Sequence, residues 1–198
     1  MSKHSDETAM MERAARGDAS AFSELYHRYS HSVYNFAYRM LSVESAAEDV
    51  TQEAFLVLIE HPDRYRADRG SVLTFLCAVA RHHIFHIFRR RGYEVESEFD
   101  HDVDQTPRPD ESGRDSLTIL LDQELAEEVA LAIKELTPLQ REVVVLREFQ
   151  ELSYEEIAKV TGAEVNVVKV RLYRGRRSLA RRLSRYLALN REAHHELR

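Results

Sequence analysis

Apolar side chains recur every three or four residues over most of this 198-residue chain, and this spacing constrains the fold more than any other feature. On a helix it gathers apolar residues on one face, whereas a half-buried strand needs a strict alternation that the sequence lacks. Three such stripes precede residue 92: Phe22, Leu25, Tyr29, Val33, Phe36 and Met40; Ala47, Val50, Ala54, Val57 and Leu58; and Val72, Phe75, Leu76, Val79, Ala80, His83, Ile84 and Ile87. We assign these stripes to a buried core and expect an all-α protein.

Residues 93–116 break this pattern. The segment, YEVESEFDHDVDQTPRPDESGRDS, contains two prolines, one glycine, few large apolar side chains and an excess of acids. Such a composition cannot bury enough surface to offset the conformational entropy lost on ordering. We therefore expect a flexible acidic linker that joins two small helical domains, residues 1–92 and 117–190, with 191–198 left as a short tail.

Helix start and stop signals are clear in the second domain. An apolar stripe predicts its first helix: Leu117, Leu121, Leu125, Val129, Ile133 and Leu136. The capping sequence TPLQ at 137–140, with proline at the first helical position, predicts a helix through Phe149. A second capping box, SYEE at 153–156, predicts a short helix to about Val160, and Gly162 supplies the turn that follows.

The last predicted helix is strongly basic. We expect Asn166 to cap it and the helix to run from Val167 to about Leu189. Residues 169–185 contain eight cations and no acid, whereas residues 94–128 contain thirteen acids and two arginines. A short helix, a tight turn and a longer basic helix form a helix-turn-helix, whose second helix enters the DNA major groove. This charge segregation indicates nucleic-acid binding despite a net charge of −6, although a solvated cationic face is the alternative.

The composition indicates in which cellular compartment the protein acts. The single cysteine, Cys77, excludes a disulfide framework and a cysteine-rich zinc site. The polar N-terminus has no apolar core of signal-peptide length, and no stretch reaches the roughly 18 apolar residues of a membrane helix. We expect a soluble, cytoplasmic protein without membrane insertion.

Several segments, in order along the chain, resemble one protein family. ELTPLQREVVVLREFQELSYEEIAKVTGAEVNVVKVRLYRGRRSLARRL (135–183) resembles the promoter −35-binding region of extracytoplasmic-function (ECF) sigma factors, the dissociable specificity subunits of bacterial RNA polymerase. AEDVTQEAFLVLIE (47–60) resembles the family's polymerase-binding helix, and RYRADRGSVLTFLCAVARHHIFHIFRRR (64–91) resembles its −10 recognition and melting region. ARGDASAFSELYHRYSHSVYNFAYRML (15–41) is similar to its opening helices.

The resemblance implies three groups of functional residues. The group expected to bind core polymerase, through the clamp helices of its largest subunit, is Glu48, Asp49, Gln52 and Glu53. The group expected at the −10 element is Tyr65, Arg66, Asp68, Phe75, His82, His86, Arg89 and Arg90. The group expected at the −35 element is Lys169, Val170, Arg171, Tyr173, Arg174 and Arg176. For the first group, an ordinary solvated acidic face is the alternative interpretation.

The histidines of HHIFHIFRRR (82–91) leave three roles open on spacing alone. His82 and His86 would share a helix face, where they could hold a metal, complete a core or lie against nucleic acid. A zinc site needs a third or fourth ligand, and none is suitably spaced nearby. The resemblance implies the DNA-facing role, because the family commonly has asparagine and aspartate at these positions. His83 falls on the apolar stripe and is expected to be partly buried, and Phe75 stands where the family usually has tryptophan.

The basic helix also departs from the family pattern. Val170 replaces a small hydroxyl residue, which favours apolar contact, for example with a thymine methyl group. We expect Leu172, Leu179 and Leu183 to face the core. We expect Arg177, Arg181 and Arg182 to contact phosphates or to be plain surface charge.

The expected function is that of an alternative sigma factor, with core RNA polymerase, promoter DNA and an anti-sigma factor as partners. It would direct polymerase to −35 and −10 elements and promote melting, without enzymatic activity, a cofactor or a metal. The acidic linker would then be a simple tether or a chain of carboxylates threaded through the basic polymerase channels. One alternative is a helix-turn-helix regulator with an N-terminal sensor domain whose histidines bind a metal. A metal-dependent hydrolase is a second, for which the sequence contains no recognisable motif.

Overall fold

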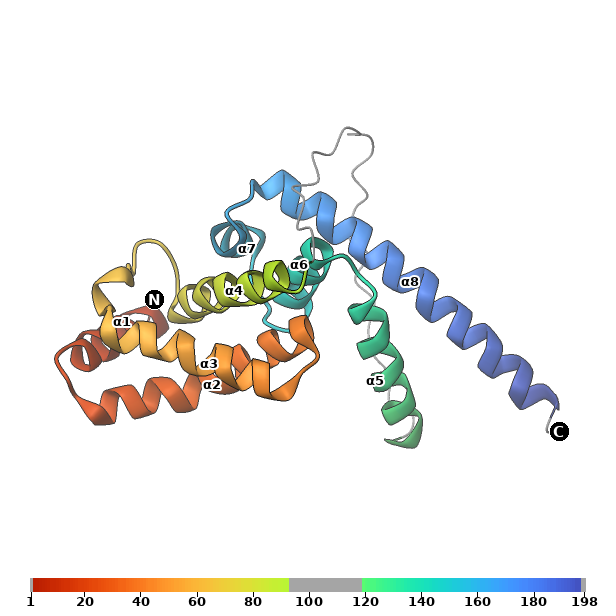
Figure 1. The fold of residues 1–198 in the computed structure, drawn as a ribbon, viewed down its shortest axis with the longest axis horizontal. Coiled ribbons are helices and arrows are strands. Elements are labelled where there is room, and N and C mark those ends of the chain that lie inside the picture. The colour runs from red at the N-terminus through yellow and green to blue at the C-terminus, as the bar shows by residue number, and fades with distance from the viewer. Residues whose placement is uncertain (1, 93–118, 197–198) are drawn as a thin grey trace.

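The computed structural model describes residues 2–92 and 119–196, and every regular element in these two ranges is helical (Figure 1). The first range contains α1 (Ser2–Ala15), α2 (Ala19–Leu41), α3 (Glu44–Glu60), the short 3-10 helix η1 (Pro62–Arg64) and α4 (Val72–Arg90). The second contains α5 (Ile119–Lys134), α6 (Pro138–Glu148), α7 (Tyr154–Thr161) and α8 (Val165–Glu196). The predicted all-α fold is confirmed, whereas the linker predicted at 93–116 lies outside the described residues.

The first domain is a bundle in which α2 packs against α1, α3 and α4. Its core follows the predicted stripes, with Leu25, Val33 and Phe36 of α2 fully buried. Asp18 caps α2 by accepting hydrogen bonds from backbone N–H groups in the first turn. Ser42, in the left-handed conformation, ends α2 and leaves only a short connection before α3 packs back against α2.

Helix α1 was not predicted from the polar N-terminal sequence. Met10 and Met11 of α1 are buried in the domain core, and so is the carboxylate of Glu7. The Tyr29 hydroxyl of α2 donates a hydrogen bond of 2.6 Å to Glu7 Oε1. Burial raises the pKa of Tyr29, and the neighbouring Glu7 adds to that shift, so the phenol stays protonated as the donor. This buried pair fixes α1 on α2.

The caps predicted for the second domain are present. The Thr137 side chain accepts a hydrogen bond from the Gln140 N–H at the start of α6. Ser153 and Glu156 form a complete capping box at the start of α7, and Gly162 ends that helix with a φ of 70°. The helix-turn-helix therefore consists of α7 and α8.

Helix α8 differs from the prediction at both ends. It begins at Val165, where the Glu164 carbonyl accepts a 3.0 Å hydrogen bond from the Val168 N–H. Asn166 thus lies inside the first turn, and the prediction that it caps the helix is wrong. The helix also continues through Glu196, beyond the expected end near residue 189, and projects away from the other helices (Figure 1).

Helix α5 follows its predicted stripe only in part. Ile133 is buried, as is Leu136 just after the helix, but Leu125 is 38% exposed although the stripe placed it in the core. Leu117, the first residue of the predicted stripe, lies outside the described residues.

The two domains are in contact. Helix α4 packs against α7 and α2 packs against α6, so the buried apolar residues of both domains form one continuous cluster. Figure 1 shows α4 lying between α3 of its own domain and α7 of the helix-turn-helix. Within residues 2–92 and 119–196, no helix is both long enough and apolar enough to cross a membrane.

Gly175 sets the separation of α6 and α8. It is buried in the middle of α8, and a Cβ atom at this position would lie 2.7 Å from Val144 Cγ2 of α6. Valine is β-branched and stiff, so its methyl group cannot swing aside as the end of a long side chain could. The lack of a side chain at residue 175 therefore permits the close packing of the basic helix on α6.

We predict that Gly175→Ala destabilises the protein. Alanine favours the helix by up to about 1 kcal/mol over glycine, but overpacking a core typically costs about 1–3 kcal/mol. Urea denaturation followed by circular dichroism should show a lower free energy of unfolding. Ala180→Gly, at an exposed position of the same helix, is the control for propensity alone. Equal or higher stability of Gly175→Ala would contradict the packing argument.

Candidate nucleic-acid and partner interfaces

The four residues of the acidic face predicted on α3 lie on one exposed side of the helix. Glu48, Asp49, Gln52 and Glu53 are all exposed, while Ala47, Val50, Ala54 and Leu58 are buried on the opposite side of the helix. Two apolar side chains that the sequence reasoning left out extend this face. Leu56 is 44% exposed and Ile59 is 52% exposed. They follow Asp49 and Gln52 by seven residues, which places them on the same side of the helix. This spacing could have predicted their exposure from the sequence.

An aromatic pair on α2 borders the acidic face. The rings of Tyr34 and Tyr38 stack with centroids 6.0 Å apart and an interplanar angle of 7°. Burial raises the pKa of Tyr34, and the negative charges of Glu44 and Glu48 add to this shift. The α3 face therefore combines negative charge with exposed apolar and aromatic surface, the mixture that a protein partner can bind.

The loop after η1 contains two pairs of residues predicted at the −10 element: an aromatic pair that is half-buried and an ion pair that is exposed. The half-buried ring of Tyr65 packs edge-on against Phe75 of α4, with centroids 5.9 Å apart. Burial raises the pKa of the Tyr65 hydroxyl. Arg66 Nε and Asp68 Oδ1 form an exposed ion pair at 3.3 Å. Ser71 then caps α4 through the Thr74 N–H, which fixes where the loop meets the helix.

The three histidines in the C-terminal half of α4 differ in their exposure to solvent. His82 and His86 are exposed together with Arg89 and Arg90, whereas His83 is half-buried, as predicted. Burial lowers the pKa of His83; Glu53 opposes this shift, and the two other histidines add to it. Among the described residues, no group of three or more histidine, cysteine, aspartate or glutamate side chains is arranged to hold a metal ion.

The basic helix α8 presents three of its six predicted residues outward. Lys169, Tyr173 and Arg176 are exposed at intervals of four and three, while Val168 and Leu172 on the opposite side are buried. These three side chains therefore lie on one face of the helix. Lys169 Nζ is 5.7 Å from the centroid of the Tyr154 ring of α7.

Three arginines of α8 contact acids of their own domain. Arg176 forms a 2.6 Å ion pair with Glu148 of α6 at the surface. Arg171, only 13% exposed, turns inward, and its NH1 atom lies 3.8 Å from the buried Glu142 carboxylate. Arg182 contacts Glu128 and Glu135. Val170 and Arg174 are half-buried on the flank of the exposed face.

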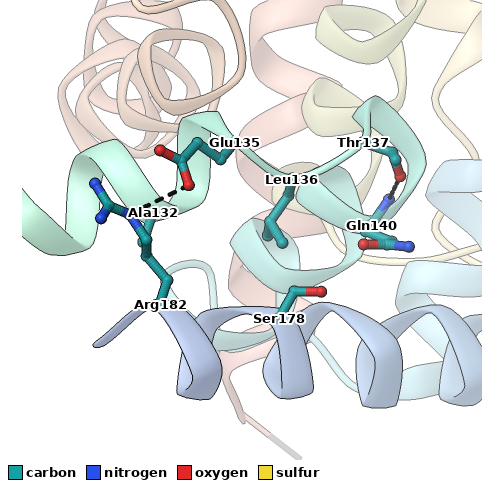
Figure 2. A pocket seen from close by; sticks show the side chains of 7 residues that line it. All are labelled: Ala132, Glu135, Leu136, Thr137, Gln140, Ser178 and Arg182. Carbon is teal, nitrogen blue, oxygen red and sulfur yellow. Dashed lines mark hydrogen bonds and ion pairs between the residues drawn. The ribbon is translucent and has the colours of Figure 1, made fainter. Parts of the chain in front are cut away.

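A pocket of about 320 Å³ lies between α5, α6 and α8 (Figure 2). The residues that line it are Ala132, Glu135, Leu136, Thr137, Gln140, Ser178 and Arg182. Arg182 Nε is 3.2 Å from Glu135, the residue just after α5, and the Arg182 guanidinium is also 3.7 Å from Glu128 of α5. Arg182 thus tethers α5 to α8 in this structure.

Comparison with known proteins identifies both domains. Residues 25–93 match the family model of sigma-70 region 2, and residues 126–179 match that of sigma-70 region 4. The chain is 33% identical over 187 residues to the ECF RNA polymerase sigma factor BldN of Streptomyces coelicolor, covering 90% of this chain and 67% of BldN. It is 30% identical over 186 residues to the ECF RNA polymerase sigma-E factor of Escherichia coli, covering 90% and 95%. It is 30% identical to SigE of Mycolicibacterium smegmatis but spans 66% of that relative's length.

Solved structures agree with the fold. The structure of CnrH in complex with the cytosolic domain of CnrY matches with a TM-score of 0.66 and 24% identity, covering 90% of this chain and 97% of that one. RpoE of Bartonella quintana, crystallised with the anti-sigma factor NepR, matches with a TM-score of 0.61 and 22% identity, covering 82% and 96%. The class is thus a two-domain, sigma-70-type transcription initiation factor. Within that class, the chain belongs to the ECF sigma factors of RNA polymerase, and the alternative of a regulator with a sensor domain is not favoured.

We predict that the exposed histidines contact DNA and do not bind a metal ion. Calorimetric titration with zinc should show no stoichiometric, high-affinity binding that depends on His82 and His86, because no third ligand joins them among the described residues. His82→Ala or His86→Ala should instead slow open-complex formation on duplex promoter and affect a template already melted at −10 much less. Tight zinc binding that both substitutions abolish would reverse this assignment.

Proposed function

We propose that α3 docks the chain on core RNA polymerase while α4 and α8 read the two promoter elements. The observation that carries this proposal is the division of exposed surface. The α3 face is acidic with apolar additions, which suits a protein partner, whereas the exposed face of α8 is cationic, which suits DNA phosphates and guanine edges. The two kinds of surface lie on separate helical domains, each with its own helix caps.

The −10 proposal rests on the aromatic and cationic residues of the η1 loop and α4. Holding a base out of the stack costs a few kcal/mol, which stacking on aromatic rings and contacts to the base edge can offset. Tyr65 and Phe75 provide aromatic surface beside the exposed Arg66 and Asp68. His82, His86, Arg89 and Arg90, on the exposed side of α4, would then follow the opened strand.

On the −35 side, we assign base reading to Lys169, Tyr173, Arg174 and Arg176, with Val170 packing beside them. Arg176 is held by Glu148 in the polymerase-free chain, so DNA phosphate or guanine would replace that carboxylate. Arg171, turned toward Glu142, would support the reading helix from behind. Arg177 and Arg181, both exposed, would contact the phosphate backbone.

We further infer that the chain acts in the cytoplasm as a binding factor and that an anti-sigma factor controls it. The chemistry of RNA synthesis would belong to the polymerase, so the chain itself would need no catalytic residue, cofactor or metal. The support for the anti-sigma partner comes from relatives of the same fold: CnrH was solved with the cytosolic domain of CnrY, and RpoE with the anti-sigma factor NepR.

The docking face gives the test of this proposal. The double substitution Asp49→Lys and Gln52→Ala should weaken association with purified core polymerase by about tenfold or more, the change expected when rim charge is reversed at a polar interface. Both side chains are exposed, so the melting temperature should be nearly unchanged. The matched control is Glu12→Lys, which reverses an exposed acid on α1 away from this face. Unchanged core affinity in the double variant would remove the α3 assignment.

A further inference from the structure

Helix α1 contains a buried carboxylate that its contact with α2 uses only in part. Glu7 is 5% exposed, and its Oε1 atom accepts the 2.6 Å hydrogen bond from the Tyr29 hydroxyl. The second oxygen, Oε2, is also buried and accepts no hydrogen bond within the described part of the chain. Burying a charged group is unfavourable unless its hydrogen bonds are made. Two apolar side chains would attach α1 to α2 without that cost, so the pair is not explained by stability alone.

The same helix packs against the start of the loop that contains residues predicted at the −10 element. Helix α1 contacts η1, and Tyr65 is the residue that ends η1, where its N–H donates a 3.2 Å hydrogen bond to the Pro62 carbonyl. The Tyr65 ring packs against the core cluster to which Met10 and Met11 of α1 belong. Its hydroxyl oxygen is buried, although the side chain as a whole is only half-buried. The phenol of Tyr65 therefore points its polar end into the domain.

Two neighbouring residues of α1 act on the Tyr65 hydroxyl. Burial raises the pKa of this hydroxyl, the negative charge of Glu7 adds to the shift, and a hydrogen bond with the Thr8 side chain opposes it. The phenol therefore stays protonated at neutral pH. Because Glu7 and Thr8 belong to one helix, a displacement of α1 changes the surroundings of the Tyr65 hydroxyl.

The loop between η1 and α4 is fixed at both of its ends. Tyr65 begins it, and Ser71 ends it as the cap of α4. Arg66 and Asp68 lie exposed between these two points, and the Tyr65 ring is edge-on to Phe75. A site that holds an extruded base needs its contacting side chains in one arrangement, which the residues behind them must fix.

We propose that the Glu7–Tyr29 pair is a positioning element for the −10 site: it fixes α1 in one register on α2, and α1 fixes the Tyr65 phenol. A hydrogen bond selects a register because it requires a defined distance and angle, whereas apolar contact is non-directional. Both residues of the pair are buried, so they act through Tyr65 and do not touch DNA. The use of Tyr65 to contact a base rests on the proposed function, but the hold of α1 on the loop does not.

Amide hydrogen exchange in the free, full-length chain tests the hold of α1 on the loop. The reporters are the N–H groups of Tyr65 and Arg69, each of which donates a hydrogen bond to the carbonyl three residues earlier. Tyr29→Phe removes the donor to Glu7 and leaves the carboxylate buried without that partner. Exchange at both reporters should rise about tenfold, because an unsatisfied buried group favours local opening.

Matched variants separate the hydrogen bond from a general loss of stability. Glu7→Gln keeps an oxygen that can accept from Tyr29 and should exchange as the wild type does, whereas Glu7→Ala should behave like Tyr29→Phe. Glu12→Ala makes the same change at an exposed position of α1 and should have no effect. The N–H of Ala47, which is bonded at 3.0 Å to a carbonyl at the start of α3, is the reference amide and should keep its rate.

The −10 strand gives the second readout. Holoenzyme reconstituted with each variant is titrated with single-stranded −10 oligonucleotides that differ at one base. Tyr29→Phe should reduce the ratio of affinities for the best and the worst base about fivefold, the change expected when one hydrogen bond is lost. Affinity for core polymerase and preference at −35 should not change, because other helices supply those contacts. A pair that only stabilises the domain would produce no selective loss at −10.

The two readouts separate failure of this proposal from failure of the proposed function. Unchanged exchange at the reporters in Tyr29→Phe, equal behaviour of Glu7→Gln and Glu7→Ala, or an unaltered −10 preference despite faster exchange would each overturn the positioning role. If exchange at Ala47 rises equally, the domain unfolds as a whole and Tyr65→Phe decides: it should speed exchange at Arg69 and flatten the −10 preference, and unchanged values would overturn the proposal. Faster exchange at the reporters, combined with a wild-type holoenzyme that shows no −10 base preference, would uphold the hold of α1 on the loop and contradict the proposed function.

Discussion

The carboxylate of Glu142 lies where α4, α6 and α8 meet, and the arrangement of both domains depends on how its charge is neutralised. An unpaired charge at a fully buried position would cost several kcal/mol. Arg171 holds α8 against α6 from within the helix-turn-helix, and Arg81 brings α4 to the same point from the other domain. Around this polar centre, apolar residues of both domains pack into one cluster. The orientation of the reading helices in the free chain follows from this arrangement.

Local features of the fold could be predicted from sequence because they depend on neighbouring residues. The capping box at Ser153, the turn at Gly162 and the stripe of α2 each need only a few positions of chain to be recognised. Contacts between distant residues could not be predicted in the same way. Glu142, between an arginine and a run of valines, has the pattern of an ordinary helix residue, and Arg81 lies 61 positions away. The fixing of α1 by Glu7 and Tyr29, 22 positions apart, was missed for the same reason.

The exposure of the candidate interface residues could be predicted more readily than their contacts. The four acidic and polar residues of α3 share an exposed face because helical periodicity alone decides that outcome. The exposure of Leu56 and Ile59 was missed because apolar side chains are usually assigned to a core, although their spacing from Asp49 and Gln52 places them on the exposed side of α3. Arg171 belongs to the basic helix by sequence, yet its side chain turns toward Glu142, because a cation stabilises the charge of that buried carboxylate.

The division of labour between the two domains is tested most directly by promoter binding of reconstituted holoenzyme across single-base variants of both elements, at two salt concentrations. Arg174→Ala or Arg176→Ala should lower affinity about tenfold or more and relax preference at one −35 position, since a base-specific arginine contact contributes roughly 1–3 kcal/mol. Arg181→Ala should weaken binding to all sequences alike and reduce the salt dependence. None of these three substitutions should alter the preferred −10 bases. A shifted −10 preference with an intact −35 preference would contradict the account.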